Sequence, residues 1–241
     1  MIKRGVWKYI DKGEIPHGRR HVGNMWVFKI KRNGIYRARL CALGYSQIPG
    51  VDFSDNFAPV IHDVTFRIVL TRKLVENLSS KTLDIETAFL YGELDEEIYM
   101  EIPKGFEEVY PSEETQGMCC FLNKAMYGLV QAARQFWKRF VKELVGQGFQ
   151  ASVADPCLLY RKDEKGICIV VMYVDDMLLV GNEESIQNVS EELEKVFNIT
   201  VEEEMTDYLG CEFKTDEEGK NAWLGQPNMV HSIRDPLRSH F

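Results

Sequence analysis

Apolar and polar positions alternate along this chain in patterns that predict most of its secondary structure. In MWVFKIKRNGIYRARLCALG, two strand-like runs flank Asn33-Gly34, a pair typical of tight hairpin turns. Strand patterns return in TLDI, in three runs within residues 157–181, and in a short hairpin at residues 205–215. Helical patterns lie between them, so we expect helices alternating with a mostly antiparallel sheet, which is the α+β class.

Three stretches have apolar residues at helical spacing. The first stretch is residues 64–78. The second, residues 131–145, is strongly amphipathic and ends near two glycines. The third stretch follows Asn182, which can cap the helix. The expected apolar faces are Val64, Ile68, Leu70, Val75 and Leu78 in the first helix, and Ile186, Val189, Leu193, Val196 and Phe197 in the third.

Two adjacent acids, Asp175 and Asp176, lie within the apolar run VVMYVDDMLLVG. Burying an ionised carboxylate is costly unless it is paired or bound to metal. Neighbouring side chains of a strand face opposite ways, so both acids are useful together only at a tight turn. Asp84, in the apolar run TLDIETAFL, is the best third acid that strand backbone could bring to that turn. Three such carboxylates could hold divalent cations for phosphoryl transfer; the alternative is a plain polar turn, with Asp84 capping or salt-bridged.

Charge is polarised along the chain. The net charge is −8, but residues 1–50 hold eleven Lys and Arg against two Asp and Glu, while residues 183–220 hold three against thirteen. A basic N-terminal region suits phosphate binding, and a solvated basic hairpin explains it equally well. The six cysteines include no C-x-x-C pair, so neither a zinc site nor a disulfide framework is expected. No segment reads as a membrane span or secretory signal, so we expect an intracellular protein.

Four motifs, taken in order, carry a family resemblance. RARLCALGYSQIPGVDFSDNFAPV, LDIETAFLYGELDEEIYMEIPKGFE and KAMYGLVQAARQFW precede YVDD, and the set resembles copia-type LTR retrotransposon reverse transcriptases over residues 6–226. The resemblance implies an RNA-directed DNA polymerase with a right-hand fold, in which basic fingers join a palm of antiparallel sheet backed by helices. The implied segments are fingers at 1–59 and 93–127, palm at 60–92 and 128–214, and the start of a truncated thumb at 215–241.

The resemblance also implies roles for individual residues. Asp84 and Asp175 would bridge two Mg²⁺ ions, for which Mn²⁺ can substitute, with Asp176 and the backbone carbonyl of Ile85 as further ligands. Phe89 would exclude a ribose 2′-OH, although core packing explains it as well. Gln131 would assist the nucleotide or simply begin a helix. The other implied contacts are Lys29, Lys31, Arg37, Arg39, Tyr127 and Gly128 for the nucleotide, and Tyr208, Leu209 and Gly210 for the primer.

The implied partners are an RNA template, a DNA or RNA primer and deoxynucleoside triphosphates, with no membrane. We expect the chain to be a piece of a Pol polyprotein that also holds ribonuclease H and integrase, located in cytoplasmic virus-like particles or the nucleus. Two other functions stay open. One is a catalytically silent, domesticated or decaying fragment that binds RNA or a protein partner, and the other is a metal-dependent nuclease that uses the same acids.

Overall fold

The chain forms two compact units in a computed structural model that describes residues 1–30, 34–106, 115–203, 205, 207–216, 221–227 and 229–230. The first unit consists of Met1–Ala58 and Thr87–Lys142, and the second of Pro59–Glu86 and Glu143–Phe241. Each unit is therefore discontinuous in sequence. Residues 87–92 and 128–142 were expected in the palm, whereas the structure groups them with the N-terminal segment. That the two units correspond to fingers and palm stays a prediction.

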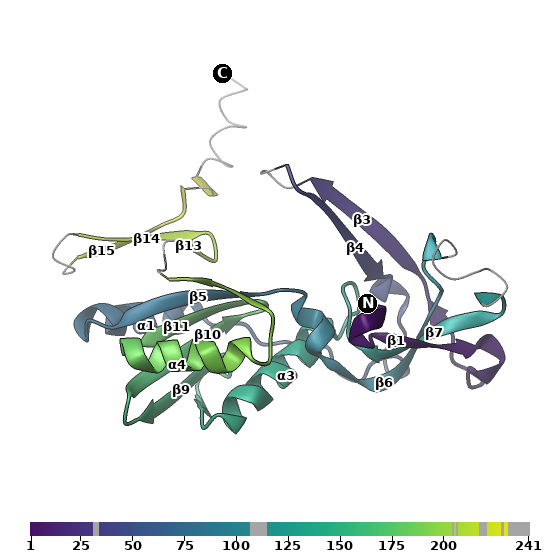
Figure 1. The fold of residues 1–241 in the computed structure, drawn as a ribbon, viewed down its shortest axis with the longest axis horizontal. Coiled ribbons are helices and arrows are strands. Elements are labelled where there is room, and N and C mark those ends of the chain that lie inside the picture. Colours follow the sequence, from purple (N-terminus) through teal and green to yellow (C-terminus); the bar gives the residue numbers. More distant parts are fainter. Residues whose placement is uncertain are drawn as a thin grey trace, which may run out of the picture. The chain divides into compact units, whose positions relative to one another are not determined.

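A four-stranded sheet forms the centre of the first unit (Figure 1). Its strands follow the order β1 (Trp7–Asp11), β7 (Met118–Lys124), β6 (Glu93–Met100) and β2 (His21–Val22). β2 is parallel to β6 and the other pairs are antiparallel. Apolar side chains from these strands form one core, because alternate residues of a strand face the same side. Its most buried members include Val22, Ile98, Met100, Leu122 and Met126.

The hairpin predicted from Asn33-Gly34 is confirmed. β3 (Asn24–Ile30) pairs antiparallel with β4 (Tyr36–Ala42) as a separate two-stranded sheet. Gly34 has the positive φ, 80°, that such turns require, and Asn33 lies outside the described residues. The two long arrows are plain in Figure 1.

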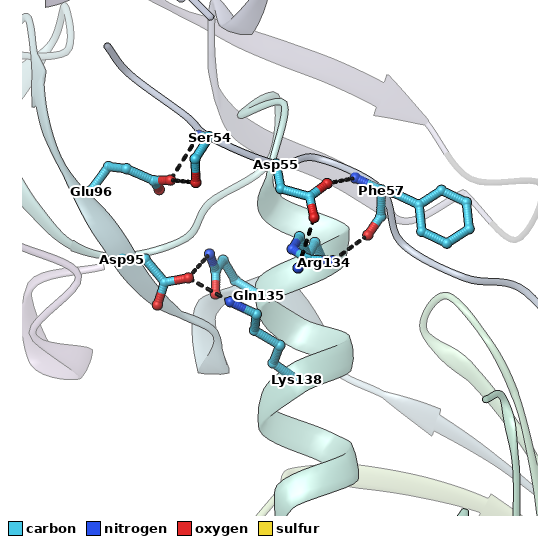
Figure 2. A network of polar contacts seen from close by, with 8 residues as sticks. All are labelled: Ser54, Asp55, Phe57, Asp95, Glu96, Arg134, Gln135 and Lys138. Carbon is cyan, nitrogen blue, oxygen red and sulfur yellow. Dashed lines mark hydrogen bonds and ion pairs between the residues drawn. The ribbon is translucent and has the colours of Figure 1, made fainter. Parts of the chain in front are cut away.

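The second predicted helix is confirmed as α3 (Ala132–Gly146). Figure 2 shows how its first turns hold neighbouring segments of the first unit. Arg134 forms an ion pair with Asp55 at 2.8 Å, and Lys138 forms one with Asp95 at 2.5 Å. The hydrogen bond from Lys138 lowers the pKa of the Asp95 carboxyl, as expected for a paired acid. These contacts explain why the start of this helix belongs to the first unit rather than to the expected palm.

A six-stranded antiparallel sheet forms the centre of the second unit (Figure 1). The strand order is β12 (Ile199–Glu202), β5 (Ser79–Ile85), β11 (Asp176–Gly181), β10 (Gly166–Tyr173), β9 (Leu158–Asp163) and β8 (Gln150–Ala151). TLDI lies in β5, and the three strands predicted in sequence are β9, β10 and β11. Helix α4 (Glu183–Glu194) packs against β10, β5 and β11. The mixture of helices with mostly antiparallel sheet confirms the α+β class.

The expected apolar face of the first helix, α1 (Asp63–Val75), is only partly correct: Leu70 and Leu78 are buried as expected, but the other three residues are not. Val64, Ile68 and Val75 are 67%, 61% and 80% exposed. Apolar residues occur on more than one side of this helix, so tertiary packing rather than periodicity selects the buried side. Phe66 and Val69 are buried in their place.

Asn182 occupies the N-cap position of α4 as predicted, but its side chain does not cap the helix. Its Oδ1 accepts a hydrogen bond from the backbone N–H of Ile167 at 2.8 Å, in the neighbouring strand β10. Glu183 and Glu184 supply negative charge to the helix N-terminus instead. The predicted buried face is otherwise correct: Ile186, Val189, Leu193 and Phe197 are buried and Val196 is half-buried.

Asp155 is a buried carboxylate that joins the start of α1 to the loop before β9. Its oxygens accept hydrogen bonds from the backbone N–H groups of His62 and Cys157, both at 3.0 Å. Asp155→Ala would leave both N–H groups without this acceptor, so we expect it to lower the free energy of unfolding by about 3 kcal/mol. Urea denaturation measures the change. Glu164→Ala, at an exposed turn, is the control and should stay within about 0.5 kcal/mol; equal losses in both variants would contradict this role.

A three-stranded sheet completes the described part of the second unit. It contains β13 (Asp207–Tyr208), β14 (Cys211–Thr215) and β15 (Ala222–Gly225). The first two strands form the hairpin predicted at residues 205–215, and β15 was not predicted. Short 3-10 helices elsewhere in the chain are η1 (Ile2–Arg4), η2 (Lys12–Glu14), η3 (Gly44–Ser46) and η4 (Ala88–Tyr91). Among the described residues, no helix combines the length and apolar character needed to span a bilayer.

Candidate active site

The candidate site lies at the tip of the β10–β11 hairpin in the second unit. Tyr173 pairs with Asp176 across the turn, so Val174 and Asp175 form its tip. Val174 has φ +57°, a left-handed conformation that is unfavourable for a β-branched residue and that is found most often at functional sites. The turn holds Asp175 and Asp176 together at one end of the sheet, as predicted.

Strand β5 brings Asp84 to the same end. In the register of β5 and β11, Asp84 lies directly opposite Asp176. The backbone N–H of Ile85 donates to the carbonyl oxygen of Asp175 at 3.5 Å. The prediction that strand backbone brings a third acid to the turn is therefore confirmed. Opposed carboxylates repel each other, and a bound cation would offset that repulsion.

Partial burial and the two neighbouring acids change the protonation of Asp176. Burial, then the charge of Asp175, then that of Asp84 raise the pKa of Asp176 to about 6. Within the part of the chain that the structure describes, no three His, Cys, Asp or Glu side chains are arranged as a ready metal site. Carboxylate oxygens are nevertheless the donors that hard divalent cations take. The mutual repulsion and the donor chemistry of the three acids thus fit such an ion.

The raised pKa of Asp176 predicts a pH-dependent cost to stability. An unfolded Asp has a pKa of about 3.9, so at about pH 3.5 this group is mostly protonated in both states and costs little. Above about pH 6 the folded state must hold an unfavourable charge. In EDTA, Asp176→Asn should therefore raise the midpoint of thermal unfolding at about pH 7.5 and leave it nearly unchanged at about pH 3.5. Scanning calorimetry checks this, and a variant less stable than the wild type at the higher pH would contradict it.

A pocket of about 540 Å³ opens beside the acids. Asp84 and Asp176 line it together with Leu209 and Gly210, whose φ values of +57° and +71° form the tight turn of the β13–β14 hairpin. Tyr208 is buried, and its hydroxyl donates to the backbone carbonyl of Asp176 at 3.2 Å. The structure thus brings the predicted primer contacts beside two of the predicted metal ligands, Asp84 and Asp176. The lining residues that sequence reasoning missed are Thr82, Leu83, Tyr173, Met177, Thr200 and Glu202.

The β3–β4 hairpin of the first unit carries its cations on one face. Lys29 pairs with Arg37, and Val27 pairs with Arg39. Because side chains alternate along a strand, the three cations share that face. Lys29 and Arg37 are exposed, whereas Arg39 is half-buried. Lys31 lies outside the described residues.

Three predicted nucleotide contacts are neighbours in the first unit. The Arg39 guanidinium lies 5.2 Å from the centre of the Tyr127 ring. The Phe89 and Tyr127 rings meet in an edge-to-face contact, with their centres 4.8 Å apart. Phe89 is half-buried and also packs against the core of the first unit, so it has both an exposed part and a packing role.

Gln131 differs from the other predicted contacts because it has no exposed surface. Both ends of its side-chain amide are hydrogen-bonded within the protein, to Gln47 and to the carbonyl oxygen of Asp52. Helix α3 begins at the next residue, in agreement with the alternative that Gln131 belongs to a helix start. Sequence reasoning missed its partner Gln47, since nothing in the local pattern distinguishes that residue from other polar loop residues.

Comparison with known proteins identifies related sequences over nearly the whole chain. Residues 5–234 match the family model described as "Reverse transcriptase (RNA-dependent DNA polymerase)". The Pol polyprotein of transposon TNT 1-94 from Nicotiana tabacum is 34% identical over 240 residues, which cover 97% of this chain and 18% of that protein. That of transposon RE1 from Arabidopsis thaliana is 36% identical over 199 residues, covering 80% of this chain and 13% of that protein.

The chain therefore spans less than a fifth of the length of these curated relatives. A solved structure of the foamy viral protease-reverse transcriptase in complex with double-stranded DNA matches 97% of this chain and 34% of that one, at 13% identity. Its TM-score of 0.44 is too low to carry an argument. On the family match across residues 5–234 and the relatedness to two plant transposon polyproteins, the chain belongs to the reverse transcriptase family, as a domain of the copia type.

Proposed function

We propose that the chain is an RNA-directed DNA polymerase domain of a Pol polyprotein. The primer 3′-OH would attack the α-phosphate of a deoxynucleoside triphosphate, which forms a new phosphodiester bond and releases pyrophosphate. The observation that carries the proposal is the position of Asp84, directly opposite Asp176 at the turn that holds Asp175. A plain polar turn would not need a third acid from a strand distant in sequence.

The reverse transcriptase family implies a divalent metal cofactor in general. In this chain we propose two Mg²⁺ ions, for which Mn²⁺ can substitute, held by Asp84, Asp175 and the carbonyl of Ile85, with Asp176 as a further ligand. When bound, such ions stabilise the negative charge that develops on the attacking and leaving oxygens. Tyr208 would hold the acid-bearing turn in place through its hydrogen bond to the backbone of Asp176.

The remaining roles concern the substrates. Lys29 and Arg37 are exposed and adjacent on one face, so they are the cations that we assign to the triphosphate. Phe89 would exclude a ribose 2′-OH. Leu209 and Gly210 line the pocket of the acids and would contact the primer end. We also propose that the template is RNA and that the same polyprotein holds ribonuclease H and integrase segments. The proposed location is an intracellular particle or the nucleus.

Primer extension on an RNA template tests this function. The wild-type chain should incorporate deoxynucleotides in Mg²⁺, and EDTA should abolish incorporation. Asp175→Asn should incorporate at least roughly a hundredfold less, because a metal-binding charge is lost from the site. Equal incorporation by both proteins would refute the assignment. Binding of RNA without any incorporation would favour the catalytically silent module, and loss of substrate in the absence of nucleotides would favour a nuclease.

A further inference from the structure

Two buried glutamines join segments of the first unit that are distant in sequence. Gln47 follows η3 and is 7% exposed, and Gln131 precedes α3 and is 0% exposed. Nε2 of Gln47 donates to Oε1 of Gln131 at 3.0 Å. Oε1 of Gln47 accepts from the backbone N–H of Val130 at 2.8 Å, and Nε2 of Gln131 donates to the carbonyl oxygen of Asp52 at 3.0 Å.

The backbone groups at the two ends determine which way both amides point. A backbone N–H can only donate and a carbonyl oxygen can only accept, so neither glutamine can be turned over without losing its bonds. In each amide the nitrogen donates one hydrogen bond and the oxygen accepts one. A buried chain of this kind is specific, because any side chain without an amide leaves a backbone group unpaired.

The glutamines lie beside a close crossing of two backbones. The N–H of Ala42 donates to the carbonyl of Tyr127 at 2.7 Å, and the N–H of Gly44 donates to the carbonyl of Gly128 at 3.1 Å. A β-carbon on Gly44 would collide with the carbonyl oxygen of Gly128. Backbone contacts therefore hold Tyr127 and Gly128 to the end of β4, and the amides hold the residues that follow the turn to the loop at residues 47–52.

We propose that Gln47 and Gln131 are positioning residues for nucleotide selection. By fixing the turn, they hold the Tyr127 ring in its edge-to-face contact with Phe89 and under the guanidinium of Arg39. The inference rests on the proposed function, in which Phe89 discriminates between deoxyribose and ribose. It assigns no contact with substrate to either glutamine, since neither has a free polar atom to offer.

The test is kinetic. Gln47→Met and Gln131→Met keep the side-chain volume and remove the amides. We expect each to raise the KM for a deoxynucleotide about fivefold and to lower the preference for deoxynucleotide over ribonucleotide, expressed as a ratio of kcat/KM, by about five- to tenfold. At saturating nucleotide kcat should change less than about twofold, because the carboxylates are untouched.

Phe89→Val is the positive control for the preference ratio. Gln150→Met, on the exposed strand β8, is the matched control and should resemble the wild type.

Each outcome decides the inference. If the folded Met variants keep the KM and the deoxynucleotide preference of the wild type, the inference is overturned. It is also overturned if kcat falls equally for deoxynucleotide and ribonucleotide while the preference is unchanged, because a purely structural role would give that result. If either Met variant is unfolded by circular dichroism, Gln47→Asn replaces it under the same criteria. If the wild type does not incorporate nucleotides, the proposed function fails, and the inference is then judged by calorimetric titration with a deoxynucleotide and Mg²⁺. Weaker nucleotide binding by the variants than by the wild type supports the inference. Equal binding by the variants and the wild type, or no binding by the wild type, overturns it.

Discussion

Asp84→Asn is expected to reduce deoxynucleotide incorporation by at least roughly a thousandfold, which corresponds to about 4 kcal/mol of activation free energy. Asn keeps the size of the side chain but removes the charge that lies opposite Asp176. A neutral amide is a poor ligand for a hard divalent cation compared with a carboxylate, so charge stabilisation of the reacting phosphate is lost. Single-nucleotide primer extension at saturating Mg²⁺ measures the effect.

Stability separates loss of chemistry from loss of fold in this variant. Because Asp84 repels Asp176, the Asn variant should unfold in EDTA at a temperature no lower than that of the wild type. Asp163→Asn makes the same chemical change at the opposite end of the same sheet, beside Gly166, where the acid pairs with Arg161. Its incorporation should stay within about twofold of the wild type. Full activity in Asp84→Asn, or inactivity that accompanies a lower unfolding temperature, would contradict the assigned role.

Local pattern located the three α-helices that the structure describes, the β3–β4 and β13–β14 hairpins and the strands β5, β9, β10 and β11, but it missed β1, β7, β12 and β15. β10 and β11 are apolar runs with a charged interruption, and only a turn at residues 174–175 satisfies both features. α1 shows where this reasoning ends. Its apolar residues occupy more than one side, so the sequence cannot identify the buried side until its neighbours are placed. The side chain of Asn182 likewise bonds a strand rather than its own helix, which depends on tertiary contact alone.

The acids were easier to predict than the residues that support them. A carboxylate in an apolar strand is conspicuous because its burial is costly, and this led from Asp175 to Asp84. Gln47 carries no such signal: a neutral amide in a loop is ordinary, and its importance comes from the chain of bonds it completes with Gln131. Roles that depend on a partner distant in sequence are invisible to local pattern, even when the partner itself is noticed.

Gly128→Ala is expected to lower the free energy of unfolding of the first unit by about 3 kcal/mol. Gly128 has φ +90°, and a β-carbon there would collide with the carbonyl oxygen of Ala42. That oxygen belongs to backbone held in the β3–β4 ladder, so it cannot move aside cheaply. The collision would separate the turn from β4 and disturb Tyr127. Urea denaturation followed by tryptophan fluorescence measures the loss, because Trp7, Trp26 and Trp137 all lie in the first unit.

Gly18→Ala is the control that separates the cost of the left-handed backbone conformation from the cost of the collision. Gly18 has nearly the same φ, +88°, but no atom lies within 4 Å of the position that its β-carbon would take. This variant therefore bears only the conformational cost of a left-handed alanine, about 1 kcal/mol. The difference of about 2 kcal/mol between the two variants measures the close approach of Gly128 to Ala42. Equal losses would mean that the backbones are not held together at this crossing, and they would remove the physical basis for the positioning role of Gln47 and Gln131.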